Sequence, residues 1–492
     1  MSLLDRAKHA LIWNAGFNVL RDILALIVML VLVRILDPEQ YGQFALVTAT
    51  IGFISVFAHQ NFIAHTLQVR DDGEVNYQDH FTAGCVIQFS MFVITNFAAL
   101  AMSYFDRFAS ISPLVSVMSI GFLLEWPCEL RLKMLERSLD WRRLRILHAI
   151  GLVISSIAAI AMAVMGAGVY ALLLPGLLVT VPFIADLFLL QKWRPTWSWS
   201  RDRYMPALRF GFLRMTSGLV GRSRKLIESG VVVYVLGFAS AGLLERAVSL
   251  GAMLCQRAAS QVMYTLYPVI TKLDPDTESY RRASSILLRG ITWFAVPSAV
   301  VLAVLAAPVV HVVYGGNWEE VVPLVPVAVF LGASAAIFHV VYLLLLGHNE
   351  ERRCVKTDIF EMIGTFVVLF LLLPKGLTEY LIGLLVIRLM VLACSLYWLL
   401  SCRAVKRKDL SDALFPAMLS SGMAYAVCGA VIGAMGWSLG SVATMLTYLG
   451  LFSIAYLSCL RIIFPQLLKE LVGYLPGNGV VGRFLFVSRE AV

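Results

Sequence analysis

Charged residues are scarce in this sequence. Asp, Glu, Lys and Arg make up 14% of the 492 residues, whereas apolar residues make up 59%. The mean hydropathy is +0.81. A soluble globular domain has roughly a quarter of charged residues and about half of apolar ones. The composition therefore excludes an ordinary soluble protein and indicates a chain whose main solvent is lipid.

Motifs for metal binding, redox chemistry and nucleotide binding are also missing. The 8 cysteines are scattered and form neither CxxC nor a cluster with histidines at metal-ligand spacing. No GxxxxGK[ST] phosphate loop is present, which disfavours an ATP-driven pump. We therefore expect neither a metal nor a cofactor. In a soluble protein the net charge of +9 would suggest a nucleic-acid partner. In a membrane protein the positions of the cations along the chain matter more than their sum, so we expect no nucleic-acid partner.

Long apolar runs, separated by charged or turn-forming residues, fill the chain. A membrane helix needs about 20 mostly apolar residues. The runs predict an all-α polytopic membrane protein with about 14 transmembrane helices. These spans lie near 11–35, 42–68, 80–104, 112–135, 145–167, 168–190, 209–237, 241–270, 286–313, 320–346, 356–374, 377–401, 412–436 and 438–464.

The basic residues between the spans alternate strongly from one side to the other. With an even number of spans, both termini and every second loop share one compartment. That side carries 29 of the 40 Lys and Arg residues, and the opposite loops carry 3. By the positive-inside rule we expect a multi-pass membrane protein with both termini in the cytoplasm.

An internal repeat is visible when the sequence is shifted by 200 residues. Segment 34–42 then falls on segment 234–242, each a short outside turn between two spans, with Leu36 on Leu236 and Gly42 on Gly242. We expect two pseudo-symmetric six-helix lobes followed by two additional helices. The predicted parts are an N-terminal lobe, a cytoplasmic linker, a C-terminal lobe, two added transmembrane helices and a cytoplasmic tail, at 1–190, 191–208, 209–401, 402–464 and 465–492.

Basic residues within the spans are the strongest functional signal. On insertion scales each costs roughly 2.5 to 3.5 kcal/mol at a helix centre, so they must face water, an acidic partner or a ligand. One of them is Arg388 in span 12. The others are predicted to bind substrate, and they come from spans 1, 7 and 8: Arg21, Arg214, Arg222, Arg224, Lys225, Arg246 and Arg257.

Uncharged polar residues share helix faces with these cations. In span 1, Asn14, Asn18 and Arg21 follow a helical spacing, and His59 lies on a polar face of span 2. Asn14, Asn18 and His59 therefore join the predicted binding site. The sequence is compatible with transport driven by a proton or sodium gradient. Three carboxylates are the candidate residues for such ion coupling: Asp22, Glu125 and Glu228.

Two explanations of the intramembrane cations compete. The structural one is internal pairing, since Glu228 lies one turn after Arg224 and Asp22 adjoins Arg21. The functional one is an anionic cargo in a water-filled cavity between the lobes. Spans 7 and 8 hold more cations than carboxylates, which favours the cargo, and a phosphate or diphosphate suits convergent Arg and Lys side chains.

Several segments resemble the polysaccharide flippases of the multidrug, oligosaccharidyl-lipid and polysaccharide transporter superfamily. The segments that carry the resemblance are Arg34 to Gly42, Phe210–Gly211, Leu236 to Ala247, Tyr267–Pro268 and Pro308 to Trp318. The resemblance covers about 30–320 and departs from the family pattern at Glu228, where members often carry Asp.

The resemblance implies a multi-pass flippase of the bacterial inner membrane without enzymatic activity. Its cargo would be an undecaprenyl-diphosphate-linked oligosaccharide, carried to the periplasmic leaflet by alternating access through a cationic cavity. Inner-membrane lipids, a polysaccharide polymerase and a chain-length regulator would be its partners. Two alternatives are a drug or lipid exporter of the same superfamily, and a membrane polymerase or ligase that acts on lipid-linked sugars. The first favours an acidic cavity, and the second usually needs a sizeable external loop, which this chain lacks.

Overall fold

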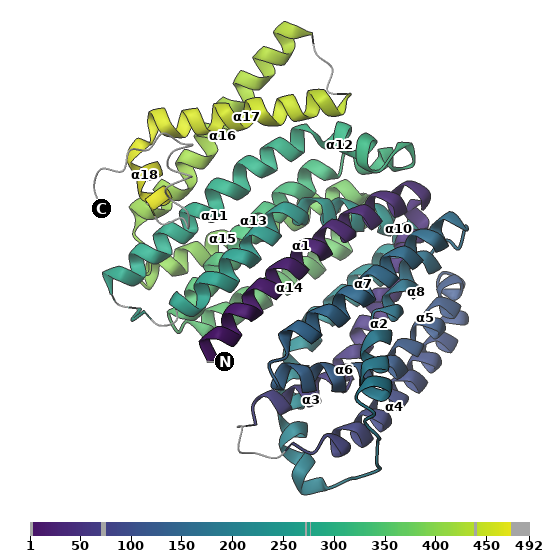
Figure 1. Ribbon diagram of the computed structural model, residues 1–492. Helices are drawn as coiled ribbons and strands as arrows, with labels where there is room; N and C mark the ends of the chain where they lie inside the picture. Colours follow the sequence, from purple (N-terminus) through teal and green to yellow (C-terminus); the bar gives the residue numbers. More distant parts are fainter. Residues whose placement is uncertain (1–2, 70–74, 271–272, 276, 437–439, 474–492) are drawn as a thin grey trace. The chain divides into compact units, whose positions relative to one another are not determined.

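The computed structural model describes the backbone of residues 3–69, 75–270, 273–275, 277–436 and 440–473. Within these ranges the side chains of 3–15, 217, 254, 256–258 and 260–270 are not described. The described residues form helices and turns without a β-strand (Figure 1). They include 13 segments long and apolar enough to cross a membrane. The all-α membrane fold is therefore confirmed.

The chain divides into two compact units, Met1–Gly242 and Leu243–Val492. In unit 1, α1 packs against α7, and α4 packs against both α5 and α6 (Figure 1). The helices of this unit are α1 Leu3–Ile35, α2 Pro38–Ile54, α3 Gln60–Ile63, α4 Tyr77–Ser103, α5 Ser112–Met118, α6 Ile120–Arg137, α7 Trp141–Val164, α8 Tyr170–Leu178 and α9 Val181–Ala185, together with the first part of α10 Arg201–Ile270.

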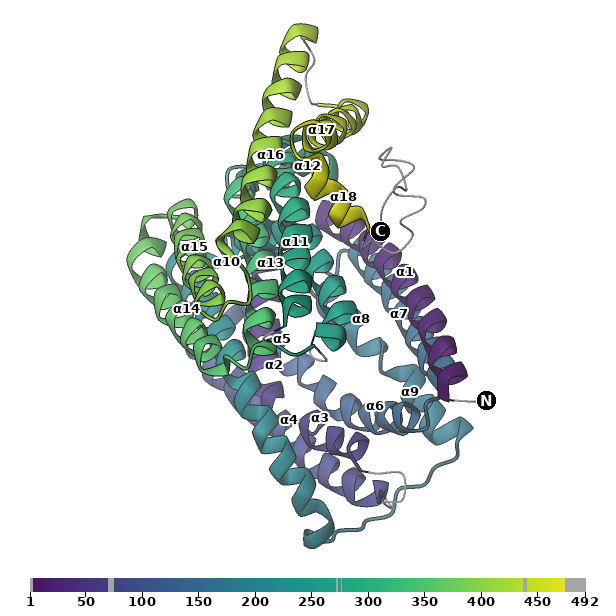
Figure 2. The same cartoon turned by 90° about the vertical axis from the view of Figure 1, so that its left-hand side faces the viewer.

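Unit 2 is built around α11 and α13, which pack along each other. The α16–α17 hairpin lies against α11, and α14 runs beside α15 (Figure 2). The helices of this unit after α10 are α11 Glu278–Val304, α12 Ala306–Val313, α13 Val325–Gly347, α14 Glu351–Leu372, α15 Leu377–Ser401, α16 Arg407–Met435, α17 Val442–Ile463 and α18 Pro465–Gly473.

The predicted repeat is visible in the helix pairings. In unit 1, α4 packs on α6, α6 on α9, and α7 on α8. Each of these helices has an equivalent in unit 2 that lies six transmembrane spans later in the chain. The equivalents pair in the same order: α11 with α13, α13 with α15, and α14 with α15. The repeated pairings confirm two pseudo-symmetric halves with α16 and α17 as additions.

Predicted spans 7 and 8 both lie in α10, which consists of two helices joined at a kink; together they are counted as one of the 13 candidate spanning segments of the described residues, where the sequence predicts about 14. The turn predicted between them is a single break at Gly237, whose φ of 87° and ψ of 174° lie outside the helical region. Glycine adopts this backbone conformation without steric cost. The predicted turn between spans 7 and 8 is therefore present, as a kink between two helices.

Two other boundaries differ from the sequence prediction. Span 2, predicted at 42–68, ends early: α2 stops at Ile54, and short helical segments, among them α3, follow from Ser55 to Leu67. The linker predicted at 191–208 is shorter, because α10 already begins at Arg201. Its first residues are held against α4, where the Thr196 amide donates to the Gln78 side chain at 2.8 Å. The lobe boundaries proposed from the sequence stay a prediction.

Candidate substrate-binding site

The first part of α10 carries most of the predicted cations and is packed tightly against the other helices of unit 1. Gly211 lies against Phe62 so closely that a Cβ there would overlap the phenyl ring. Tyr204, Ala207 and Met215 continue this contact and are buried in one apolar cluster. This packed face fixes the rotation of α10 about its axis. It therefore also fixes the directions in which the basic side chains farther along the helix point.

The four cations on this segment differ in exposure. Arg214, Arg222 and Lys225 are exposed, whereas Arg224 is half-buried. Arg222, Arg224 and Lys225 fall within the candidate membrane segment Gly218–Met253. An exposed guanidinium or ammonium group at this depth is unfavourable against lipid and needs water or an anion. Arg214 lies nearer the helix start, with its guanidinium 5.8 Å from the centre of the Phe210 ring.

Arg222 joins three helices of unit 1. Its Nη1 donates a hydrogen bond to the Gly52 carbonyl of α2 at 3.1 Å. A Cβ at position 52 would lie 3.1 Å from the same nitrogen, so glycine leaves room for the guanidinium. Glu125 of α6 lies within electrostatic range of Arg222 and of Glu129. The structure therefore brings a predicted cation and a predicted ion-coupling carboxylate together, and it adds Gly52, which the sequence did not single out.

The polar residues of α1 form a separate group. Arg21 and Asp22 are paired at 3.2 Å, and their side chains are 48% and 42% exposed. Asn18 is half-buried. The side chain of Asn14 lies outside the described ones. The Arg21–Asp22 pair is thus open to its surroundings within the apolar segment Gly16–Ile35.

Two further predicted residues of unit 1 are not exposed. Glu228, one turn after Arg224, is half-buried. His59 is 1% exposed and lies in the bend after α2 rather than on a helix face. The polar helix face predicted for span 2 is therefore wrong at this position, because the helix ends before it. Cargo would reach His59 only after its neighbours move.

Unit 2 contains the other predicted cations. Arg246 is half-buried and lies in electrostatic range of Tyr314, a buried residue at the end of α12. The side chain of Arg257 is outside the described ones. Arg388, which has no assigned role from the sequence, makes two hydrogen bonds of 2.7 Å to Glu361 of α14. This pairing accounts structurally for the cation in span 12.

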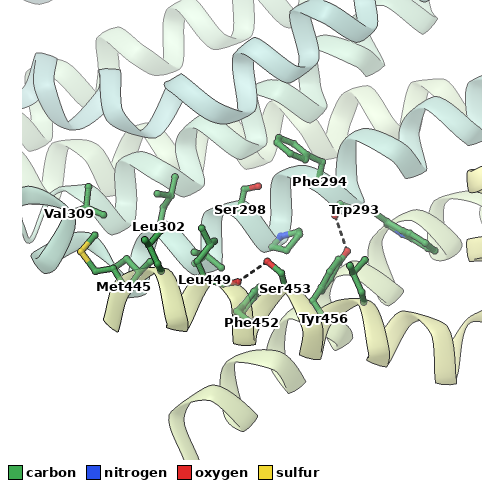
Figure 3. A pocket seen from close by; sticks show the side chains of 15 residues that line it. Trp293, Phe294, Ser298, Leu302, Val309, Met445, Leu449, Phe452, Ser453 and Tyr456 are labelled. Atoms are coloured by element: carbon green, nitrogen blue, oxygen red, sulfur yellow. Dashed lines mark hydrogen bonds between the residues drawn. The ribbon is translucent and has the colours of Figure 1, made fainter. Parts of the chain in front are cut away.

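A second feature of unit 2 is an apolar groove with a volume of about 480 Å³ between α11 and α17 (Figure 3). Phe294 and Leu302 line one side, and Leu449 and Phe452 line the other. The polar groups at its wall are mostly satisfied internally: Tyr456 donates to the Trp293 carbonyl at 2.9 Å, and Ser453 donates to the Leu449 carbonyl at 2.7 Å. The groove thus suits a hydrocarbon chain.

Sequence comparisons find relatives over most of the chain. The profile of a family described as "Polysaccharide biosynthesis protein" matches residues 31–323. An uncharacterized membrane protein in the cps region of Klebsiella pneumoniae is 21% identical over 81% of this chain and 83% of its own length. The lipopolysaccharide biosynthesis protein WzxC of Escherichia coli K12 is 20% identical over 73% of this chain and 74% of its own.

A third relative is the succinoglycan biosynthesis transport protein ExoT of Rhizobium meliloti, which is 21% identical over 63% of this chain and 64% of its own length. Among solved structures, the lipid II flippase MurJ in an inward closed conformation has a TM-score of 0.69 at 12% identity, covering 93% of this chain and 100% of its own. An inward-facing multidrug resistance MATE transporter of the MOP superfamily has a TM-score of 0.56 at 14% identity, covering 78% of this chain and 95% of its own. At these identities the structural likeness concerns the fold alone.

Proposed function

Because the chain belongs to the family of polysaccharide biosynthesis proteins, we propose that it is a flippase for an undecaprenyl-diphosphate-linked oligosaccharide. The cargo is carried from the cytoplasmic to the periplasmic leaflet of the inner membrane for a surface polysaccharide. No covalent bond of the cargo is made or broken, so the protein is a transporter and not an enzyme.

The observation that carries this proposal is the position of Arg222. Its guanidinium is exposed within a membrane segment and is fixed by the Gly52 carbonyl. A cation at this depth favours an anionic ligand over lipid. Lys225, three residues later, is exposed as well. A diphosphate offers several oxygens to such groups, and Arg can bind two of them at once.

The apolar groove between α11 and α17 supports the lipid part of the cargo. An isoprenoid chain is hydrocarbon throughout, and burial of each of its methylene-sized groups contributes about 0.8 kcal/mol. A groove of about 480 Å³ accommodates part of a long chain while the rest stays in the bilayer. A cationic region for the diphosphate and an apolar groove for the chain are the two properties that such a cargo requires.

The names of two relatives support the same cargo class. ExoT is named as a transport protein for succinoglycan biosynthesis and WzxC as a lipopolysaccharide biosynthesis protein. Both names concern surface polysaccharides. A drug exporter would instead favour an acidic site, because most exported drugs of that class are cations.

Reconstitution tests the proposal directly. Purified protein in liposomes is given a fluorescent undecaprenyl-diphosphate-linked oligosaccharide, and translocation is scored by the fraction that an outside reagent can reach. We expect wild-type protein to accelerate translocation over protein-free liposomes, and Arg222→Gln to reduce the rate by about tenfold or more, as for loss of a charge-assisted contact. Arg352→Gln, an exposed cation at the start of α14, is the control. Equal rates with and without protein would reject the flippase assignment.

The orientation is a separate part of the proposal. Both termini lie in the cytoplasm in this proposal, which the 29-to-3 distribution of basic residues supports. Reporter fusions at either terminus, active only in the cytoplasm or only in the periplasm, test it. A periplasmic signal from either end would contradict it.

A further inference from the structure

Several buried polar atoms in unit 1 have no hydrogen-bond partner among the described residues, and they gather near the end of α2. They are both ring nitrogens of His59, Nδ1 of His80, the side-chain amide nitrogen and oxygen of Gln88, and the hydroxyl of Tyr204. The four residues are 1%, 7%, 0% and 1% exposed, respectively. None of them takes part in the site described above except His59.

Three elements bring these side chains together. The ring centres of His59 and His80 are 5.9 Å apart, and those of His80 and Tyr204 are 5.2 Å apart. On α4, His80, Gly84 and Gln88 follow one another at every fourth residue and so share one stripe of the helix. His59 lies over the middle of this stripe, since a Cβ at Gly84 would be 3.1 Å from its Nδ1.

Such a cluster is unstable when dry. An unsatisfied buried polar group costs about 1 to 3 kcal/mol, and native folds satisfy nearly all such groups with protein atoms or ordered water. A buried water needs about 2 to 4 polar partners. Two imidazoles, an amide and a phenol provide both donors and acceptors for it. The cluster therefore has the chemistry of a hydrated site.

We propose that His59, His80, Gln88 and Tyr204 form a buried hydrated site that takes up a proton during the transport cycle, with the two imidazoles as the proton acceptors. The link to transport rests on the proposed function. Proton uptake itself depends on the conformation of unit 1 and needs no cargo.

The direction of the pH effect follows from the burial of His59, which lies outside the spanning segment Pro38–Phe57. Burial, with a smaller effect of His80, lowers the pKa of His59 from 6.5 to about 3, so this conformation holds a neutral imidazole at physiological pH. When water enters, the pKa returns toward its ordinary value. Each pH unit below about 6.5 then favours the hydrated conformation by up to about tenfold, and this effect ends near the lower pKa.

The charged groups around the cluster are few. His65, in the turn before the next loop, and Asp79 of α4 both interact electrostatically with His80. The Asp79 carboxylate accepts hydrogen bonds from Arg203 Nε at 2.8 Å and from Ser198 Oγ at 2.7 Å. The negative charge of Asp79 is thus largely compensated by Arg203 at the start of α10. Asp79 is therefore not the group that takes up the proton.

The cluster is connected to the helix that carries the cations. Tyr204 belongs to α10 and packs in one apolar cluster with Val56 and Phe62, on either side of His59 in the chain. Arg222, further along α10, is bonded to Gly52, two residues before α2 ends. Hydration of the cluster therefore acts on both contacts that hold the cationic part of α10.

Histidine-selective NMR of the full-length protein in nanodiscs, without cargo, tests the proton site. His59→Gln and His80→Gln assign two of the eight histidines, and His311→Gln, an exposed residue of α12, is the control. We expect at least one of the two imidazoles to titrate between about pH 5 and pH 7. Replacing one of the two histidines should shift the titration of the one that remains. If both stay neutral to about pH 5 in folded protein, the proposal is overturned.

Gly84→Ala provides a variant that keeps both imidazoles. Its Cβ would press on the His59 ring, whereas Gly176→Ala on α8 meets nothing within 4 Å and is the matched control. We expect Gly84→Ala alone to shift the titration. An unchanged titration in Gly84→Ala would show that His59 is not the acceptor.

Liposomes with a proton gradient then test the coupling. An imposed gradient should accelerate wild-type translocation by several-fold and leave His59→Gln and His80→Gln unaffected. If the imidazoles titrate but wild-type liposomes translocate no lipid-linked sugar, the proposed function fails and the proton site stands. If translocation occurs and the gradient acts equally on wild type and both variants, the coupling fails.

Discussion

Gly42 and Gly242 each lie against the backbone of the segment that contains the other glycine. A Cβ at Gly42 would overlap the Phe238 carbonyl, and a Cβ at Gly242 would overlap the Pro38 carbonyl. The shift of 200 residues that relates the two glycines also relates Pro38 to Phe238. Within unit 1, the two copies of the repeated turn segment, 34–42 and 234–242, therefore contact each other at equivalent positions. Only glycine permits the backbones to approach so closely.

Gly42→Ala and Gly242→Ala should each destabilise the protein by about 1 to 3 kcal/mol or more, because the methyl group has backbone as its neighbour and cannot displace it easily. Thermal unfolding in detergent measures the change. Gly230→Ala, also in α10 but before the break at Gly237 and with nothing within 4 Å, is the control. It should be neutral or slightly stabilising. Equal unfolding temperatures for all three variants would contradict the close contact.

The glycines illustrate what the sequence predicted well. The segments that carry the family resemblance contain Gly42, Gly211, Gly237 and Gly242, and each has a structural reason to be glycine: three are close approaches and Gly237 has a positive φ. Apolar runs predicted the membrane helices, because lipid imposes length and composition on every span.

Contacts between helices were much harder to predict. Helical periodicity places residues on a face but does not say which other helix that face meets. For this reason the sequence left Arg388 without its partner Glu361, 27 residues away. His59 was misplaced because nothing in its apolar surroundings marks the end of α2 at Ile54. The Arg222 contact with Gly52 required the same three-dimensional information.

The Glu361–Arg388 pair should be essential to the stability of unit 2. Both side chains are mostly buried, at 11% and 17% exposed, and Arg388 also lies 5.1 Å from the centre of the Phe338 ring. Removing one partner leaves an uncompensated buried charge, which costs about 3 to 5 kcal/mol. Thermal unfolding of Glu361→Ala and Arg388→Ala measures this.

The double variant separates pairing from packing. Glu361→Ala with Arg388→Ala should lose less stability than the sum of the single changes, because no charge is left unpaired. Additive losses would show that the two residues contribute independently.

The contact between α18 and α11 should hold the end of the described chain. Arg289, only 3% exposed in its side chain, donates to Glu470 at 2.8 Å, and Arg282 lies 3.8 Å from the other carboxylate oxygen. Glu470→Ala should release α18 while the membrane helices stay folded. Limited proteolysis is expected to cleave 465–473 faster, on the order of tenfold for a loss of about 1.4 kcal/mol.

Lys469→Ala, next to Glu470 in the chain, is the matched control. It changes a charge on the same short helix without removing the acceptor of Arg289. Unchanged cleavage in Glu470→Ala would show that α18 is held by its apolar residues, such as Leu468 and Val472, which are buried in one apolar cluster with residues of α11 and α17.

The apolar groove should distinguish cargo by the length of its hydrocarbon chain. Leu449→Trp introduces a larger side chain into the groove, whereas Ile454→Trp, on the same helix, is 67% exposed and lies outside the lining. If the isoprenoid chain occupies the groove, Leu449→Trp should slow translocation of the undecaprenyl-linked cargo by about tenfold. This corresponds to a loss of about 1.4 kcal/mol, which is less than the contribution of two buried methylene groups. The same assay with a short-chain analogue should respond little, because that chain does not need the groove. Matching effects of the two substitutions on both cargoes would mean that the groove serves only the packing of α17, and the cationic part of α10 would then be the sole basis of cargo recognition.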